Sequence, residues 1–144
     1  MTTSNTERLS TLLRRQQRSV AVPETIRAWS LAGCTASPLS DDRHEELIDT
    51  LRVETGVRER KNDPLASALA NIGNPSDVVA VVGWNVEIDP GILLARKALQ
   101  QTEAFWRGAY PDGFVVCDQP LSRILIVDFD EADYVIEELR FNCD

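Results

Sequence analysis

The densest group of side chains that could do chemistry lies in the segment Leu125-Ile-Val-Asp-Phe-Asp-Glu-Ala-Asp133. It places Asp128, Asp130 and Asp133 directly after an apolar run, and Asp118 precedes the run by a few residues. Carboxylates that converge on one ion could hold Mg²⁺ at about 2.0–2.1 Å and support hydrolysis. The sequence therefore offers one enzymatic alternative, a small metal-dependent hydrolase that uses this Asp cluster.

A strand that ends in Asp-x-Asp resembles the first motif of the haloacid-dehalogenase-like phosphohydrolases, in which the first carboxylate is the nucleophile and both hold magnesium. Asp128 and Asp130 match these two positions. Such a fold needs further strands, a lysine and more metal ligands, whereas only eleven residues follow Asp133. A calcium loop is also excluded, because loop position 6 is not glycine and position 12 would be Leu139. The pattern is more typical of a polar turn between antiparallel strands, and we expect no tight metal site.

The remaining reactive residues do not form a catalytic set. His44 is the single histidine, which excludes sites that need two, and it lies on the inner stripe of a predicted helix. Cys34, Cys117 and Cys143 form no CxxC pair, so we expect Cys34 and Cys117 to be buried small hydrophobes. No glycine-rich phosphate loop is present. The sequence therefore predicts a protein that is not an enzyme, with no catalytic residue, cofactor-binding residue or metal ligand.

The distribution of charge is the global feature with functional content. The chain has a formal charge of −8, and its residues 83–144 hold twelve acidic and five basic side chains. A basic footprint for nucleic acid is absent, although Arg14, Arg15 and Arg18 form one dense basic patch. An acidic face on a small protein suits the binding of a basic protein, because complementary potential speeds association. The competing interpretation is that the acidity maintains solubility.

These observations favour a small acidic protein-binding module, most concretely an inhibitor of the immunity type that neutralises a basic enzyme, toxin or nuclease domain. The expected surface combines carboxylates for steering with aromatic anchors of the kind that dominate binding hot spots. We expect the partner-binding residues to be Asp128, Asp130, Glu131, Asp133, Tyr134, Glu138, Tyr110 and Trp106. No direct contact with nucleic acid or membrane is expected.

The first half of the chain has helical periodicity. One predicted helix begins at the capping box Ser4–Glu7, with Leu9, Leu12 and Leu13 on one face, and a second runs from Pro23 to Gly33. A third begins at Ser40 and a fourth at Asp63-Pro64. The segment 58–63 between them is expected to be a solvated connection. The arginines Arg14, Arg15 and Arg18 are expected at a solvated helix end.

The second half changes to the period of strands. The predicted order is a strand at Val78–Ile88, a long helix at Pro90–Arg107, and strands at Phe114–Asp118, Arg123–Phe129 and Tyr134–Phe141. Val78–Ile88 and Arg123–Phe129 are apolar on both faces, so both are expected in the sheet interior, covered by the long helix. The last strand is expected nearer an edge.

The fold class predicted from this pattern is α+β: N-terminal helices followed by a β-α-β-β-β mostly antiparallel sheet under a long helix. Composition is ordinary for a globular protein, with 43% hydrophobic and 26% charged residues. We expect a single domain, 1–144, with a helical leader at 1–75 and a sheet-containing half at 76–144. The first 19 residues lack the apolar core of a secretory signal, which favours a cytoplasmic protein.

Overall fold

The computed structural model describes residues 3–53, 57–61, 65–69, 72, 77–130 and 133–140, with the backbone alone for 3–7, 53, 57–61, 66, 130, 133 and 134. Within these residues, seven strands form one antiparallel sheet in the order β1-β4-β3-β5-β6-β7-β2. The strands are β1 (Ser37–Pro38), β2 (Val57–Lys61), β3 (Val78–Gly83), β4 (Gly91–Ala95), β5 (Gly113–Cys117), β6 (Arg123–Asp130) and β7 (Asp133–Arg140). The α+β class is confirmed.

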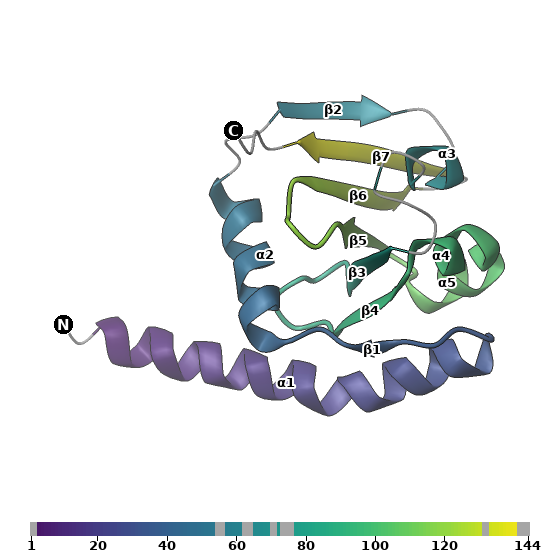
Figure 1. Ribbon diagram of the computed structural model, residues 1–144. Helices are drawn as coiled ribbons and strands as arrows, with labels where there is room; N and C mark the ends of the chain where they lie inside the picture. The colour runs from purple at the N-terminus through teal and green to yellow at the C-terminus, as the bar shows by residue number, and fades with distance from the viewer. Residues whose placement is uncertain are drawn as a thin grey trace.

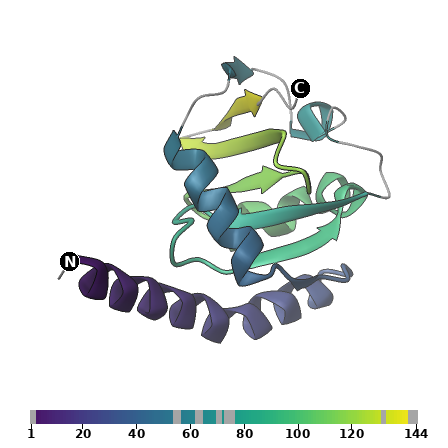
Figure 2. The ribbon, with the colours of Figure 1, turned by 60° about the vertical axis from the view of Figure 1, so that its left-hand side comes forward.

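Helices cover both faces of the sheet and one of its edges (Figure 1). The long helix α1 runs beside the edge formed by β1 and β4, and its N-terminal end projects beyond the sheet. In the turned view α2 lies across one face of the sheet (Figure 2). The helices are α1 (Thr3–Leu31), α2 (Asp41–Val53), α3 (Leu65–Leu69), α4 (Arg96–Gln101) and α5 (Glu103–Ala109).

Each sheet face has its own apolar core, because side chains alternate along every strand. The larger core lies between the sheet and the helices α3, α4 and α5, with Trp29 of α1 at its border. Its largest buried side chains from the helices include Trp106 and Leu99. The smaller core lies under α2, where Leu47 packs over Val82 and Ile124. Central strands therefore carry apolar residues on both faces, as their sequences indicate.

The N-terminal region is one helix rather than the predicted two. Helix α1 continues through Pro23, where the sequence predicts a new start. Pro23 is exposed, so the carbonyl that loses its hydrogen bond faces water, and the helix bows with its convex side outward (Figure 1). Leu9, Leu12 and Leu13 do share a face, but that face is exposed.

The predicted long helix at Pro90–Arg107 is wrong in its first part. Gly91–Ala95 is strand β4, which pairs with β3 on one side and with β1 on the other. Its residues are apolar on both faces, so the sequence pattern fits a helix and a strand equally well. The segment forms a strand because it pairs with strands on both sides. The rest of the segment forms α4 and α5, which bury Leu99 and Trp106.

The two strands predicted in the interior of the sheet are confirmed there, and two strands, β1 and β2, were missed. Both β3 and β6 have neighbours on each side, although β3 ends at Gly83 rather than at Ile88. The segment predicted as a solvated connection contains β2, which pairs with β7. Its alternation of valine, arginine and glutamate is weak as a strand signal, so the pairing rather than the sequence identifies it.

Helix α2 shows how local sequence and packing agree. Ser40 precedes the helix, and its Oγ accepts a hydrogen bond from the backbone N–H of Arg43 at 3.3 Å. Asp41 and Asp42 occupy the first turn, where the helix dipole favours negative charge. The predicted inner residues His44, Leu47 and Ile48 are buried. This helix therefore forms where its caps and period predict it.

Candidate protein-binding groove

Two neighbouring hollows lie where the C-terminal half of α1 meets two turns of the sheet. One, of about 290 Å³, is lined by the β3–β4 turn and by the residues between α5 and β5. The other, of about 310 Å³, lies between α1 and α5. They share Thr25, Pro90, Ala109 and Tyr110, and we call them together the Trp84 groove.

The Trp84 groove combines an exposed aromatic side chain with negative charge. Trp84 is 41% exposed, whereas Trp29 and Trp106 are buried. The charged residues that line the groove are Glu24, Asp89 and Asp112, and no lysine or arginine of the described part of the chain lines it. An aromatic face beside carboxylates attracts a cation, and guanidinium or ammonium groups are the cations that proteins present. The groove therefore suits a basic side chain of a partner.

Tyr110 forms the wall that joins the two hollows. Its hydroxyl oxygen accepts a hydrogen bond from Nε1 of Trp29 at 3.1 Å. Burial raises the pKa of Tyr110 and the charge of Asp89 raises it further, against the hydrogen bond from Trp29. The hydroxyl is therefore protonated at neutral pH, so its own proton remains available as a hydrogen-bond donor. The ring of Phe105 packs edge-on against the ring of Trp29, with 4.6 Å between the ring centroids, and it also lines the hollow.

The β3–β4 turn, residues 84–90, is held in shape from within. The backbone N–H of Asp89 donates to the carbonyl of Asn85 at 2.8 Å, and Asp89 Oδ2 accepts from the N–H of Asn85 at 2.9 Å. Gly83 allows this close return of the chain, since a Cβ there would come 2.5 Å from Asp89 Oδ2. One carboxylate of the groove is thus positioned by the turn that carries it.

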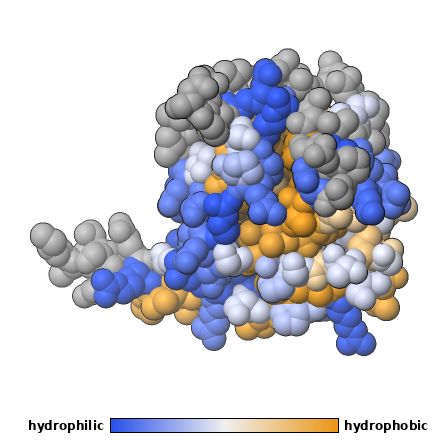
Figure 3. Space-filling view, in the orientation of Figure 1, coloured by the Kyte–Doolittle hydropathy of each residue, from blue (hydrophilic) through white to orange (hydrophobic). Residues whose placement is uncertain are grey.

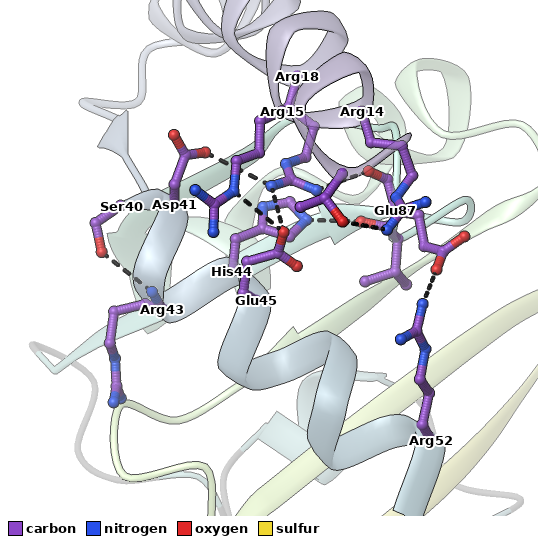
Figure 4. A network of polar contacts seen from close by, with 12 residues as sticks. Arg14, Arg15, Arg18, Ser40, Asp41, Arg43, His44, Glu45, Arg52 and Glu87 are labelled. Carbon is purple, nitrogen blue, oxygen red and sulfur yellow. Dashed lines mark hydrogen bonds and ion pairs between the residues drawn. The ribbon is translucent and has the colours of Figure 1, made fainter. Parts of the chain in front are cut away.

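Helices α1 and α2 also hold this turn, through the network drawn in Figure 4. Nη1 of Arg18 donates to the carbonyl of Glu87 at 2.8 Å, and Nε2 of His44 donates to the carbonyl of Val86 at 2.6 Å. Arg52 forms an ion pair with the Glu87 carboxylate. The turn that carries Trp84 is therefore attached to two helices.

Opposite charges balance inside this network. Arg18 is only 1% exposed, and its Nη2 lies 3.4 Å from Glu45 Oε1 and 3.6 Å from Asp41 Oδ1. Arg15 approaches the same Glu45 oxygen at 3.3 Å. The expected solvated helix end is therefore wrong for Arg18 and Arg15, because their acidic partner is α2 of the same chain. The fold brings these charges together across about thirty residues of sequence.

Two titrating groups of the network have shifted pKa values. Burial lowers the pKa of His44, helped by the charge of Arg18 and opposed by the hydrogen bond to Val86. Burial by itself would raise the pKa of Glu45, but the hydrogen bonds and charges of Arg15 and Arg18 together lower it. At neutral pH the network therefore holds a neutral imidazole and an ionised carboxylate.

Four of the eight partner-binding residues expected from sequence have described side chains, and two of these lie at or beside the groove. Tyr110 lines it, and Asp128 is exposed with its Cα paired to Gly113, which also lines it. Asp130, Glu131, Asp133 and Tyr134 have side chains outside the described residues.

The other two expected residues are corrections. Trp106 is 1% exposed, its Nε1 donates to the carbonyl of Leu99 at 2.9 Å, and its ring stacks on Phe129. Glu138 is 2% exposed and lies near Arg123 (3.5 Å) and Arg140 (3.7 Å). Trp106 lies on the core-facing side of helix α5, and Glu138 alternates to the same sheet face as buried Ile136, so neither side chain is available to a partner.

The fold separates Asp118 from Asp128, two of the four carboxylates of the metal-site alternative. Asp118 is opposite Arg123 at the start of β6, so Asp128 lies five residues, roughly 17 Å, further along. Asp118 instead closes its turn by accepting hydrogen bonds from the N–H groups of Ser122 at 2.8 Å and Arg123 at 3.1 Å. No group of three or more metal-ligating side chains occurs among the described residues.

Sequence reasoning missed most of the groove. Trp84 lies within the predicted strand Val78–Ile88, Asp89 lies directly before the predicted helix Pro90–Arg107, and Glu24 lies within the helix predicted from Pro23. The signal that could have found the turn is Gly83 followed by the pair Asp89-Pro90, which bracket the five residues Trp84–Ile88. No local signal places α1 beside this turn, because that contact spans more than sixty residues.

Comparison with known proteins supplies no further assignment: no family model, curated protein or solved structure matches this chain. Among the described helices, none has an apolar stretch of the length that a bilayer crossing requires.

Proposed function

We propose that this chain is a protein-binding module whose Trp84 groove receives a basic segment of a partner protein. The observation that supports this most directly is the groove itself, where exposed Trp84 shares one hollow with Asp89 and Asp112 and Glu24 lines the adjoining one, with no lysine or arginine among the described lining residues. A partner would place an arginine or lysine side chain against Trp84, with Asp89 and Asp112 as acceptors. Arginine fits this role better, because its planar guanidinium both stacks on an aromatic ring and binds carboxylates.

The charge of the whole chain supports the same class of partner. The formal charge is −8, and the segment that carries most of the sheet holds twelve acidic against five basic residues. Exposed Asp128 is paired with Gly113 of the groove lining, and Glu131 and Asp133 follow it closely in the sequence. Such a field raises the association rate with a basic protein and disfavours acidic ones.

The proposed role of this binding is inhibition of the immunity type, in which the module covers a basic enzyme, toxin or nuclease domain. This role requires complementary surfaces and no catalytic group, and the sequence predicts none. A rigid groove suits it, because a preformed site loses little entropy on binding. The attachment of the β3–β4 turn to α1 and α2 provides that rigidity.

The test is affinity capture from the source cells with three baits compared side by side. The baits are the unchanged chain, a groove variant with Trp84→Ala and Asp112→Asn, and a control variant with Asp42→Asn and Asp49→Asn on the exposed side of α2. We expect a basic protein to be retained by the unchanged and control baits and lost with the groove variant. Retention by all three baits, or capture of an acidic protein, would contradict the proposal.

Kinetics on the captured pair then test the steering charges. Association should slow several-fold from low to physiological ionic strength, because salt screens exposed charges over about 8 Å at 0.15 M. Charge reversal at Glu131 and Asp133 should slow it further, while the groove variant should mainly speed dissociation. An association rate that ignores both salt and these reversals would show that the acidity serves solubility alone.

A further inference from the structure

Helix α1 has the reverse of the usual amphipathic arrangement: charged residues face the body of the protein, and apolar residues face solvent. Its N-terminal half turns Arg14, Arg15 and Arg18 toward the body, where Arg15 and Arg18 meet the carboxylates of α2. The opposite side carries apolar residues with more than half of their surface in solvent: Leu9, Leu12, Leu13 and Val20. Figure 3 shows this hydrophobic surface on the projecting part of the helix. A solvent-exposed apolar stripe of this kind marks an interaction surface.

The exposed stripe continues along the whole helix with a regular spacing. It consists of Leu9, Leu13, Gln16, Val20, Glu24, Arg27 and Leu31, all of them exposed. The intervals are 4, 3, 4, 4, 3 and 4 residues, which is the three-and-four spacing of helices that pack lengthwise. Read backwards, the intervals are the same. The stripe therefore has the same spacing when the helix is turned end for end about its central residue, Val20.

We infer that a second copy of this chain covers the stripe, with the two α1 helices antiparallel and related by a two-fold axis at Val20. This arrangement places Val20 against the second copy's Val20, and Gln16 against the second copy's Glu24. Further out, Leu13 meets the aliphatic part of Arg27, and Leu9 faces Leu31. Each contact occurs twice, as a two-fold interface requires. Val20 and Leu31, which are 74% and 84% exposed, both lie on the stripe.

Charge favours a second copy on this surface. The two charged residues of the stripe, Glu24 and Arg27, have opposite signs, and the antiparallel register places neither against a like charge. The amide of Gln16 can donate a hydrogen bond to the Glu24 carboxylate of the other copy. Elsewhere the chain is acidic, so association through most other faces would oppose like charges.

The same charges disfavour an anionic membrane as the occupant. An interfacial helix carries arginine or lysine at the margins of its apolar face, where they meet lipid headgroups. In α1, Arg15 and Arg18 are instead turned inward and paired with Glu45. The stripe between Leu9 and Val20 contains no charged residue.

The outward bow of α1 identifies where two copies approach most closely. Figures 1 and 2 both show the convex side of the helix turned away from the sheet. Two convex helices touch first near their middle, which places the closest layers at Val20 and at the pair formed by Gln16 and Glu24. The bodies then lie on opposite sides of the helix pair, so each Trp84 groove keeps Asp89 and Asp112 accessible, while Glu24 at the groove margin contacts Gln16 of the other copy.

Disulfide trapping tests the register. In a Cys143→Ser background, Val20→Cys should form a covalent dimer on mild oxidation, because the residue meets its own copy at the axis. Gln16→Cys and Glu24→Cys should cross-link when mixed, with little product from either variant alone. Asp49→Cys, exposed on α2, is the control that should remain monomeric. Equal cross-linking by Asp49→Cys and Val20→Cys would overturn the proposal, and so would homotypic products of Gln16→Cys alone.

Sedimentation of the unmodified chain provides the measurement without cysteines. We expect a dimer at high micromolar concentration and a monomer for Val20→Glu, which keeps the fold because the position is exposed. A monomer at every concentration overturns the inference. So does binding to vesicles of anionic phospholipid that is lost with Val20→Glu, because the stripe would then face lipid. Neither result bears on the groove variants, so the proposed function stands or fails separately.

Discussion

Arg18 of helix α1 donates a 2.8 Å hydrogen bond to the backbone carbonyl of Glu87, 69 residues further along the chain. The guanidinium is buried, and its other contacts are the carboxylates of Glu45 and Asp41 on α2. One side chain thus joins both helices to the turn that carries Trp84 and Asp89. The position of the groove therefore depends on a residue that lies outside it.

Replacement of Arg18 by methionine should destabilise the protein by about 2 kcal/mol, because the substitution removes a charged hydrogen bond to the Glu87 carbonyl. Asp41 is exposed and Glu45 is partly exposed, so both carboxylates retain contact with water, which limits the cost. Urea unfolding measures the loss, and Arg8→Met, on the exposed part of α1, is the matched control with little change. Equal urea midpoints for the two variants would show that the contacts of Arg18 do not stabilise the folded protein.

The single histidine makes a specific pH dependence testable. The pKa of His44 is lowered in the folded protein, while the unfolded chain has the ordinary value near 6.5. Below about pH 6.5 the unfolded state binds a proton that the folded state does not. The free energy of unfolding therefore decreases as the pH is lowered from about 6.5 to the folded pKa. His44→Gln should make the melting temperature less dependent on pH between about pH 6.5 and the folded pKa. A slope unchanged by this substitution would contradict the assignment.

The lowered pKa of Glu45 acts at more acidic pH in the same direction. Its stabilisation is present above the ordinary value of 4.5 and is lost as the pH falls through the folded pKa. Glu45→Gln should therefore reduce the melting temperature at neutral pH and have progressively less effect below the folded pKa. Scanning calorimetry of the variant and the unchanged chain across that range measures this convergence.

Two glycines should respond to alanine in opposite ways. At Gly91 of β4, a Cβ would lie 2.9 Å from both Nδ1 of His44 and a methyl carbon of Leu39, so alanine should cost about 1–3 kcal/mol. At Gly108 of α5 a Cβ meets nothing within 4 Å, so alanine should be neutral or add up to about 1 kcal/mol. Thermal unfolding of both variants measures the contrast, and a more stable Gly91→Ala would refute the close packing.

Fluorescence quenching should report on the groove without knowledge of the partner. Trp84 is the exposed tryptophan, so small ions quench its emission and leave buried Trp29 and Trp106 largely unaffected. Caesium should quench it more efficiently than iodide, because the carboxylates of Asp89 and Asp112 attract the cation. Asp112→Asn should reduce this difference, and Trp84→Phe should remove the quenchable fraction. Stronger quenching by iodide would contradict a negative groove.

The buried thiols should be unreactive in the folded protein. Cys34 and Cys117 are buried, as the sequence predicts, and burial raises the pKa of Cys117 to about 12. Because the thiolate is the nucleophile, iodoacetamide at mildly alkaline pH should modify both residues only after unfolding. Mass spectrometry of the alkylated native chain checks this. Rapid native alkylation at Cys117 would show that the α2 core opens.

Little of the candidate groove could be predicted, and the reason differs by residue. Tyr110 was found because it is one of the few aromatic side chains of the acidic half that could anchor a partner. Trp106 and Glu138 were misplaced because exposure depends on which face of an element meets the core. That choice is made by neighbours distant in sequence, such as Leu99 and Phe129 around Trp106, and Arg123 beside Glu138.

The sequence by itself determined the elements whose signals are local. Ser40 and the apolar period of the following residues define α2, and the alternating apolar runs after Gly113 define β5, β6 and β7. The acidic balance of the second half is likewise a property of composition. Capping, period and charge act over a few residues, so the folded state does not change them.

Only the tertiary structure decided the conformation or orientation of segments whose sequence is compatible with two arrangements. Gly91–Ala95 fits either period, and it becomes a strand because β1 and β3 supply hydrogen-bonding partners on both sides. In α1 the leucines face outward because the inward positions carry Arg15 and Arg18, whose charges are compensated by α2. A buried arginine without such partners would be too costly. The exposed stripe is thus the consequence of an ion pair formed across the fold.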